Sequence, residues 1–274
     1  MKVLRIKLYQ PEANYRIPFS YQRRFTYPIP PYSTVKGLIC NLLGIDNENE
    51  EMYKNVTKLS MAIYGRYDNL VKDYIWFRNL SIESHTKRFF SKYNRTLDFS
   101  VQHPGGQIPV KIDVLNNVHL IIYIYHENVD FLEKIRNAFV NPVNRNSTIH
   151  LGRSEDWLVF EEIKYVDLNN AGIKDIIKFD YYTWMPEQDY LMQGCTDNKE
   201  LYKDYFNKID GNLFRLPTFY SIKEGKRIFD KYIIAKLYEK GSVSISPFDK
   251  CYLLKILIDG ETNLPIFLAD LGGV

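Results

Sequence analysis

The chain has 274 residues, a formal net charge of +3 and a pI near 8.5, so a strongly positive surface would require local clustering of basic residues. Its contents of 45% hydrophobic and 25% charged residues are those of a globular protein with a real core, and they exclude a disordered chain. Aromatic residues make up 15% of the chain, which suits both sheet surfaces and base stacking.

The sequence carries no pattern of a metal, cofactor or membrane protein. Cys40, Cys195 and Cys251 form no Cys-x-x-Cys pair, so neither a disulfide framework nor a zinc ribbon is predicted. The five histidines lack metal-ligand spacing, and no phosphate loop, dinucleotide loop or hydrolase motif occurs. We therefore expect no metal and no cofactor. No apolar run approaches the roughly 18 residues of a membrane span, which favours a cytoplasmic protein.

The first predicted strand, Val3–Tyr9, alternates charged with apolar residues and places Ile6 and Leu8 on its buried side. Farther along, Pro28, Pro30 and Pro31 fix an extended path, so that no helix begins before Tyr32.

Ser33 is the predicted N-cap of the helix that follows, whose apolar residues from Val35 to Leu43 have helical spacing. The free backbone N–H groups at its start, with Lys36 and the pair Arg23–Arg24 nearby in sequence, would suit a phosphate. An ordinary capped helix behind a proline-rich lead-in would give the same pattern.

An acidic run from Asp46 to Glu51 suits the start of a second helical segment. Predicted strands and helices then follow one another as Met61–Arg66 (strand), Tyr74–Leu80 (strand), Ile108–Leu115 (strand), His119–Tyr125 (central strand), a helix capped by Asn128 and closed by Asn141-Pro142, and strands in Ile149–Ser154 and Trp157–Tyr165.

The most polarised segment lies between Ser84 and Leu97, which contains no acidic residue. Its basic residues are Lys87, Arg88, Lys92 and Arg95, and the interleaved rings are His85, Phe89, Phe90 and Tyr93. Such a segment is typical of single-stranded RNA binding, where cations neutralise phosphates and rings stack on bases. A solvated hairpin whose aromatic residues pack on its own base is the alternative.

The order of elements predicts an α+β fold. A βαββαβ, ferredoxin-like pattern, shared with the RNA recognition motif, would occupy residues 1–167 with an insertion at about 84–111. A smaller β-rich domain would occupy residues 168–274, with strands predicted in Ile176–Trp184, Phe214–Tyr220, Phe229–Tyr238 and Tyr252–Ile258.

The segment Gly152-Arg153-Ser154-Glu155-Asp156 is a second candidate site. A glycine lets the backbone approach a ligand, and an arginine can pair with a phosphate. A tight turn with a surface salt bridge is the alternative. Metal-free RNA cleavage would need an acid and a base near the RNA backbone, and His85 or His103 with Tyr93 could provide them, but no motif assigns a catalytic residue.

Taken together, the run from Phe25 to Leu38 and the run from His150 to Asp156 resemble one family. It is the RAMP-superfamily CRISPR-associated subunit that holds the 5′ handle of the guide RNA in type I Cascade complexes, the fifth core Cas family. The sequence is most similar to type I-B members, over essentially its whole length, including the insertion that forms a thumb-like β-hairpin in the family.

The resemblance implies a ferredoxin-like N-terminal domain, a smaller β-rich C-terminal domain and a non-catalytic role in antiviral defence. The family caps the crRNA 5′ handle and contacts the Cascade backbone subunit and large subunit. In subtype I-C the family itself cuts precursor crRNA without metal, using a Tyr, Lys and His set that no motif places here. That endoribonuclease is the alternative function.

The resemblance also assigns RNA-binding residues. By motif, the residues at the handle are Ser33, Thr34, Lys36, Gly37, Gly152 and Arg153. By charge, Arg23 and Arg24 join them, together with the thumb residues Lys87, Arg88, Lys92 and Arg95.

Overall fold

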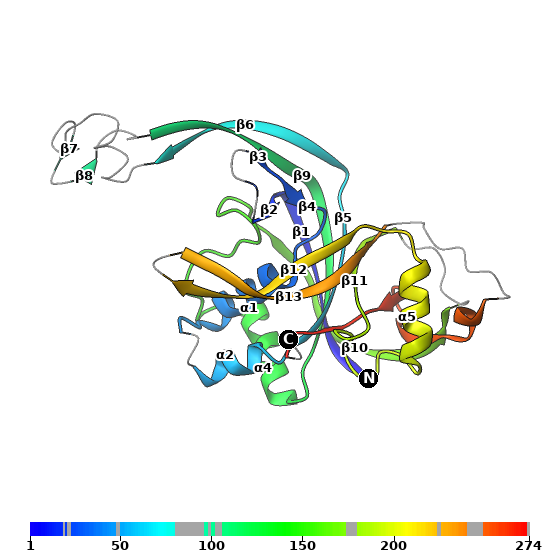
Figure 1. Ribbon diagram of the computed structural model, residues 1–274. Coiled ribbons are helices and arrows are strands. Elements are labelled where there is room, and N and C mark those ends of the chain that lie inside the picture. The colour runs from blue at the N-terminus through cyan, green and yellow to red at the C-terminus, as the bar shows by residue number, and fades with distance from the viewer. Residues whose placement is uncertain are drawn as a thin grey trace.

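The computed structural model describes residues 1–18, 20, 23–47, 50–79, 96–97, 100–101, 106–173, 180–223, 226–239 and 249–272. These residues form a mixed α/β structure built mainly on one large antiparallel sheet (Figure 1). Its strands, in spatial order, are β12 (Leu213–Lys223), β13 (Lys226–Tyr238), β11 (Tyr182–Pro186), β5 (Ser60–Arg66), β9 (Gly106–Tyr125), β1 (Lys2–Ala13), β10 (Val159–Gly172), β14 (Lys255–Asp259) and β15 (Leu264–Ile266).

Several shorter elements complete the described part of the chain. Strands β3 (Arg23–Arg24) and β6 (Asn69–Asn79) pair with β9, and β16 (Ala269–Asp270) pairs with β5. Two small ribbons pair β2 (Tyr15–Arg16) with β4 (Thr26–Tyr27), and β7 (Thr96–Leu97) with β8 (Ser100–Val101). The helices are α1 (Tyr32–Leu43), α2 (Glu51–Val56), α4 (Val129–Val140), α5 (Lys199–Lys208) and the 3-10 turn η2 (Lys250–Leu253).

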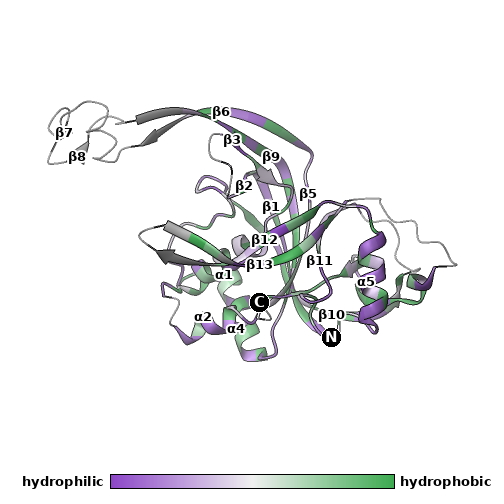
Figure 2. Ribbon diagram, in the orientation of Figure 1, coloured by the Kyte–Doolittle hydropathy of each residue, from purple (hydrophilic) through white to green (hydrophobic). Residues whose placement is uncertain are grey.

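Four antiparallel strands, β5, β9, β1 and β10, form the centre of the sheet. They follow one another in the chain as β1, α1, β5, β9, α4 and β10, with the short α2 before β5. Helix α4 has the predicted cap, because the Asn128 side chain accepts the N–H of Phe131 at 3.1 Å. Figure 2 shows hydrophobic residues concentrated along the central strands, while α5 carries many hydrophilic ones.

One side of β1 is buried at Ile6 and Leu8 as predicted, and the other side is also buried at its start, at Val3 and Arg5. Leu4, Ile6 and Leu8 face one core, which also contains residues of α1 and α4. Val3 faces a second core, made mainly of residues from the last third of the chain. The C-terminal segments therefore cover the face of the central sheet that the helices leave open.

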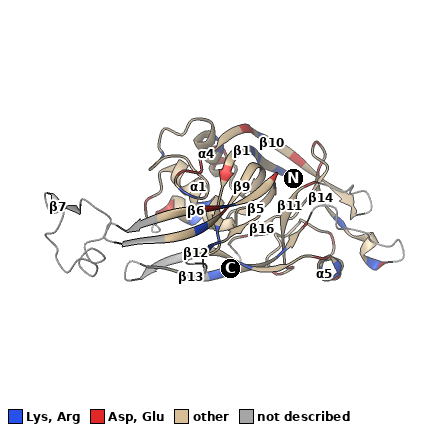
Figure 3. Cartoon of the chain, turned by 90° about the horizontal axis from the view of Figure 1, so that it is seen from above, with Lys and Arg blue, Asp and Glu red and all other residues tan. Residues whose placement is uncertain are grey.

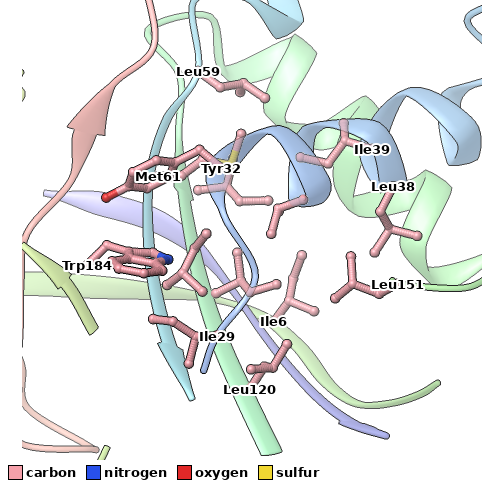
Figure 4. Packing of buried hydrophobic residues seen from close by; sticks show 14 of the residues in the cluster. Ile6, Ile29, Tyr32, Leu38, Ile39, Leu59, Met61, Leu120, Leu151 and Trp184 are labelled. Atoms are coloured by element: carbon pink, nitrogen blue, oxygen red, sulfur yellow. The ribbon is translucent and has the colours of Figure 1, made fainter. Parts of the chain in front are cut away.

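The proline-rich lead-in to α1 is held by the first core (Figure 4). Ile29 fits over Gly65, where an added Cβ would come within 2.5 Å of the Ile29 side chain. The indole Nε1 of Trp184 donates to the carbonyl of Pro30 at 2.9 Å. These contacts fix the extended path that the prolines impose, and, as predicted, no helix begins before Tyr32, the first residue of α1.

The predicted cap of α1 is wrong. The N-cap position is Pro31, no side chain caps the helix, and the N–H of Thr34 is bonded to the carbonyl of Pro31 at 3.0 Å. Ser33 is therefore the second residue of the helix, because the extended geometry of Pro31 already marks the boundary.

A buried charge joins the two ends of the chain. Arg5 of β1 is fully buried and donates to Asp259 of β14 at 2.5 Å and to Glu162 of β10 at 2.9 Å. The hydroxyl of Tyr123 in β9 also donates to Asp259, at 2.7 Å, and Glu261 accepts from Arg5 at 2.5 Å. Four neighbouring strands thus converge on one ionic network.

The C-terminal third is continuous with the sheet. The boundary predicted near Leu168 falls inside β10, and β11, β12 and β13 extend the sheet beyond β5. Helix α5 was not predicted, although Asn198 caps it and its apolar residues Tyr202, Tyr205 and Phe206 lie on one buried face. The two-domain division itself stays a prediction.

A long two-stranded arm, β6 with β9, leaves the body of the molecule (Figure 1). The two strands predicted in Ile108–Leu115 and His119–Tyr125 are one strand, which pairs with β6 in the arm and with β5 and β1 in the body. Asn117, at the root, has a left-handed φ of 53°. Its side chain bonds Asp68 and the hydroxyl of Tyr9, which holds the arm's direction.

Replacing Trp184 with Phe should lower the free energy of unfolding by about 1–3 kcal/mol, because the buried carbonyl of Pro30 loses its donor. Chemical denaturation followed by circular dichroism measures this. Trp157→Phe is the control, since Trp157 is 56% exposed and should change stability little. Equal midpoints for the two variants would show that the Trp184 bond does not hold the lead-in.

Acid should weaken the Arg5 network. Burial alone would raise the pKa of Asp259, but the hydrogen bonds from Tyr123 and Arg5 outweigh it and leave the pKa lowered. A carboxylate with a lowered pKa stabilises the fold fully above its unfolded pKa of about 3.9, and this stabilisation is lost as the pH falls from there through the lower pKa of the folded state. We expect the free energy of unfolding to begin to fall near about pH 5 and to go on falling until the pH is below the lowered pKa of Asp259.

The variant Asp259→Asn tests the source of this pH dependence. It should be destabilised at neutral pH by about 3 kcal/mol, because Arg5 stays buried with one anion fewer. Its stability should also fall less steeply on acidification than that of the unaltered protein. Urea denaturation at a series of pH values measures both effects, and parallel pH curves would contradict the assignment to Asp259.

Candidate nucleic-acid interface

Asn14, directly after β1, connects the segments that sequence reasoning singled out. Its side-chain amide donates to the carbonyl of Arg24 in β3 at 3.2 Å and to that of Asp113 in β9 at 2.7 Å. Its own N–H donates to Oδ2 of Asp156 at 2.9 Å. The Arg23–Arg24 strand, the root of the arm and the 151–156 turn therefore meet at one buried amide.

The 151–156 turn is also bonded to β1 through Gln10. The Gln10 amide donates to the carbonyls of Leu151 and Asp156 at 2.9 and 3.2 Å, and the buried hydroxyl of Tyr15 donates to Gln10 at 2.6 Å. Residues 149–154 form this turn and not the predicted strand, because their backbone groups bond to side chains and within the turn.

Gly152 is required by the close approach of the chain at the turn. Its φ is +116°, and an added Cβ would lie 2.6 Å from Oδ2 of Asp156 and 2.9 Å from the carbonyl oxygen of Asn14. The backbone thus comes close to another part of the same protein, which accounts for this glycine without a ligand.

Arg153 is bonded to carboxylates of the chain. Its Nε donates to Oδ1 of Asp156 at 2.8 Å, and its Nη2 lies 2.6 Å from the same oxygen. Glu12 and Glu155 each approach the guanidinium to 3.6 Å. Partial burial alone would lower the pKa of Arg153, but the bond to Asp156 outweighs it and the pKa is raised. This geometry is that of a turn closed by a salt bridge.

Lys36 is buried between aromatic rings. Its Nζ lies 3.7 Å from the ring centroid of Phe219 in β12 and 3.3 Å from the hydroxyl of Tyr53 in α2. The same helix leaves Ser33 and Thr34 half-buried and Gly37 exposed. Lys36 therefore connects α1 to β12 and α2. The other residues of α1 that were assigned to the handle, Ser33, Thr34 and Gly37, reach the surface.

Arg23 is exposed and lies in a row with two residues of the arm. The strand registers pair Arg23 of β3 with Lys111 of β9, and Lys111 with Tyr74 of β6. Arg23 and Lys111 are both exposed, whereas Arg24, on the other side of β3, is half-buried. Sequence reasoning named Arg23 but missed Lys111 and Tyr74. Side chains alternate between the two faces of a strand, and this alternation along the two predicted strands is the sequence feature that could have placed Tyr74 and Lys111 on one face.

The other predicted RNA-binding residues, Lys87, Arg88, Lys92 and Arg95, lie outside the described residues, as do His85, Tyr93 and His103. Within the described ranges, no group of three or more His, Cys, Asp or Glu side chains could hold a metal ion. None of the helices described is both long and apolar enough to cross a membrane.

Comparison with known proteins gives a family match. Residues 3–209 match the model of the family described as "CRISPR-associated protein (Cas_Cas5)". A search of curated proteins finds no match. A chain of a solved "CRISPR RNA-guided surveillance complex" is similar at 12% identity and a TM-score of 0.51, over 91% of this chain and 95% of that one. A "CRISPR protein from Archaeoglobus fulgidus" is similar at 12% identity and a TM-score of 0.42, over 98% and 100%.

Changing either Gly152 or Asp156 should open the turn. Gly152→Ala adds a clash at a left-handed φ, and Asp156→Asn leaves Arg153 without its closest anion. We expect each variant to lower the free energy of unfolding by about 2–3 kcal/mol. Glu155→Gln is the control, because the exposed contact of Glu155 with Arg153 at 3.6 Å should contribute less than about 0.5 kcal/mol to the free energy of unfolding. Thermal denaturation with limited proteolysis measures this, and a control as unstable as Asp156→Asn would refute the argument.

Proposed function

Because the chain belongs to the Cas5 family of CRISPR-associated proteins, we propose that it is the RNA-binding subunit that caps the 5′ handle of the crRNA in a type I surveillance complex. The observation that carries the proposal is the family match over residues 3–209. The similarity in fold to a chain of an RNA-guided surveillance complex, over 91% of this chain, supports it.

In this proposal the centre of the molecule is a ferredoxin-like unit of type I-B character. The strand order β10, β1, β9, β5, with α1 and α4 as the two crossover helices, supports the ferredoxin-like part. The arm corresponds to the thumb, and residues 168–274 to the β-rich C-terminal domain. The partners would be the crRNA handle, the Cascade backbone subunit and the large subunit, in the cytoplasm.

The geometry supports a division of labour among the assigned residues. Arg23, Ser33, Thr34 and Gly37 have surface access and would meet the RNA backbone. Lys36 and Arg153 already contact rings and carboxylates of the chain, so they would act by holding α1 and the 151–156 turn in place. Asn14 keeps that turn beside β3 and the arm.

Charge also supports an RNA backbone as ligand. Arg23, Lys72 and Lys111 are exposed at the root of the arm, and sequence adds four basic residues at positions 87–95. These would form a local positive surface on a chain whose net charge is only +3. Such a cluster of basic residues suits a ligand with a high density of negative charge, such as an RNA backbone.

Binding of labelled single-stranded handle RNA to the purified chain tests the proposal. If about four phosphates are neutralised, log K should fall with log salt at a slope of roughly −3, since each phosphate contributes about −0.7. Arg23→Gln should weaken binding and reduce the slope by about 0.7. Lys203→Gln, at an exposed position of α5, is the matched control and should change neither. A salt-independent affinity would refute the proposal, and cleavage of precursor repeat RNA without metal would favour the endoribonuclease.

A further inference from the structure

The arm has two different faces. On one of them Val110, Ile112 and Val114 form a small buried cluster, against which the half-buried Ile75 packs. The opposite face carries two large aromatic side chains, Tyr74 and Trp76, which are 55% and 58% exposed. The buried cluster already supplies the packing that joins β6 to β9, so the exposed rings are not needed to hold the strands together.

The two exposed rings lie side by side on β6. Their centroids are 6.4 Å apart and their planes are inclined at 80°. Tyr74 pairs across the arm with Lys111, and Trp76 pairs with Pro109, so a cation and a flat apolar residue border the rings. The rings therefore present exposed aromatic surface next to a positive charge.

The charge of this face favours an anionic ligand. Arg23, Lys111 and Lys72 lie on it by register, and Asp113 is the carboxylate opposite Lys72. Asp73 lies on the other face, and its Oδ1 accepts the N–H of Tyr74 at 2.7 Å. Among the described side chains of this face, three cations against one anion, around exposed rings, match a ligand that combines phosphates with flat bases.

We propose that the face of the arm formed by Tyr74, Trp76 and Lys111 is a base-stacking platform for single-stranded RNA. This inference rests on the proposed function and adds a specific contact to it. A base would stack on Trp76 or Tyr74, while Lys111 and Arg23 neutralise the flanking phosphates. A neighbouring protein subunit would not require the cations beside the rings, so RNA is the better match.

Tryptophan fluorescence offers a direct test, because a stacked base quenches an indole. The chain has three tryptophans: Trp76 is 58% exposed, Trp157 is 56% exposed, and Trp184 is fully buried. The full-length chain is titrated with a single-stranded uridine octamer and, separately, with inorganic polyphosphate of equal charge. We expect quenching by the RNA alone. The quenching should persist in Trp157→Phe and disappear in Trp76→Phe.

Affinity gives a second measurement. Tyr74→Ala with Trp76→Ala should weaken binding of the octamer by about five- to a hundredfold and leave the salt slope unchanged, because stacking is lost and the cations remain. Lys111→Gln should weaken binding and reduce the slope. Both side-chain positions on β6 are exposed, so the fold should be retained, as circular dichroism would confirm.

The outcomes separate this inference from the proposed function. If the unaltered chain binds RNA but the double variant binds equally well, the platform is refuted and the handle-binding proposal stands. Equal quenching by polyphosphate would also refute stacking. If the double variant binds RNA normally but no longer joins the other Cascade subunits, the face is a protein contact and the inference is wrong. Absence of any RNA binding would refute both proposals.

Discussion

The buried guanidinium of Arg5 is the constraint on which the arrangement of the whole sheet depends. A charge inside a core is costly unless anions and hydrogen bonds surround it. Its partners come from β10, from β14 and from Glu261 just beyond it, more than 150 residues farther along the chain. The last third of the chain must therefore fold back over β1 before Arg5 is neutralised. The same requirement brings C-terminal segments over the second face of β1, β5 and β9, where Val3, Tyr64 and Tyr123 are buried.

Polar side chains with fixed partners also build the candidate interface. Asn14, Gln10 and Asp156 are buried, and each bonds a different segment of backbone. They hold a turn, a short basic strand and the root of the arm in one place, while the exposed cations and rings on this frame remain available to a ligand. Arg153 and Lys36 resemble ligand contacts by type, but their charges already have partners within the chain.

The sequence predicted the elements whose signals are local. The start of α1 follows from its prolines, the cap of α4 from Asn128, and most strands from apolar runs. It could not predict what depends on distant contacts. Nothing near Arg5 in sequence indicates that it is buried, and nothing near Asn117 indicates that two predicted strands are one. Helix α5 was missed although its cap and buried face are visible in the sequence, because the neighbouring strand-like segments favoured an all-β interpretation. At the candidate site, the motifs located the 151–156 turn, whereas the exposed row on the arm required the register between strands.

Along the arm, the pairing of β6 with β9 places successive side chains on alternate faces. Lengthening each arm strand by two residues would extend the arm by about 6.7 Å and keep every ring and cation on its present face. Adding a single residue to each strand between the root and the rings would move Tyr74, Trp76 and Lys111 to the opposite face. Insertions or deletions in the arm strands should therefore comprise an even number of residues per strand wherever function depends on which side chains share that face. Selection can thus act on whether the number of residues added or lost is even or odd.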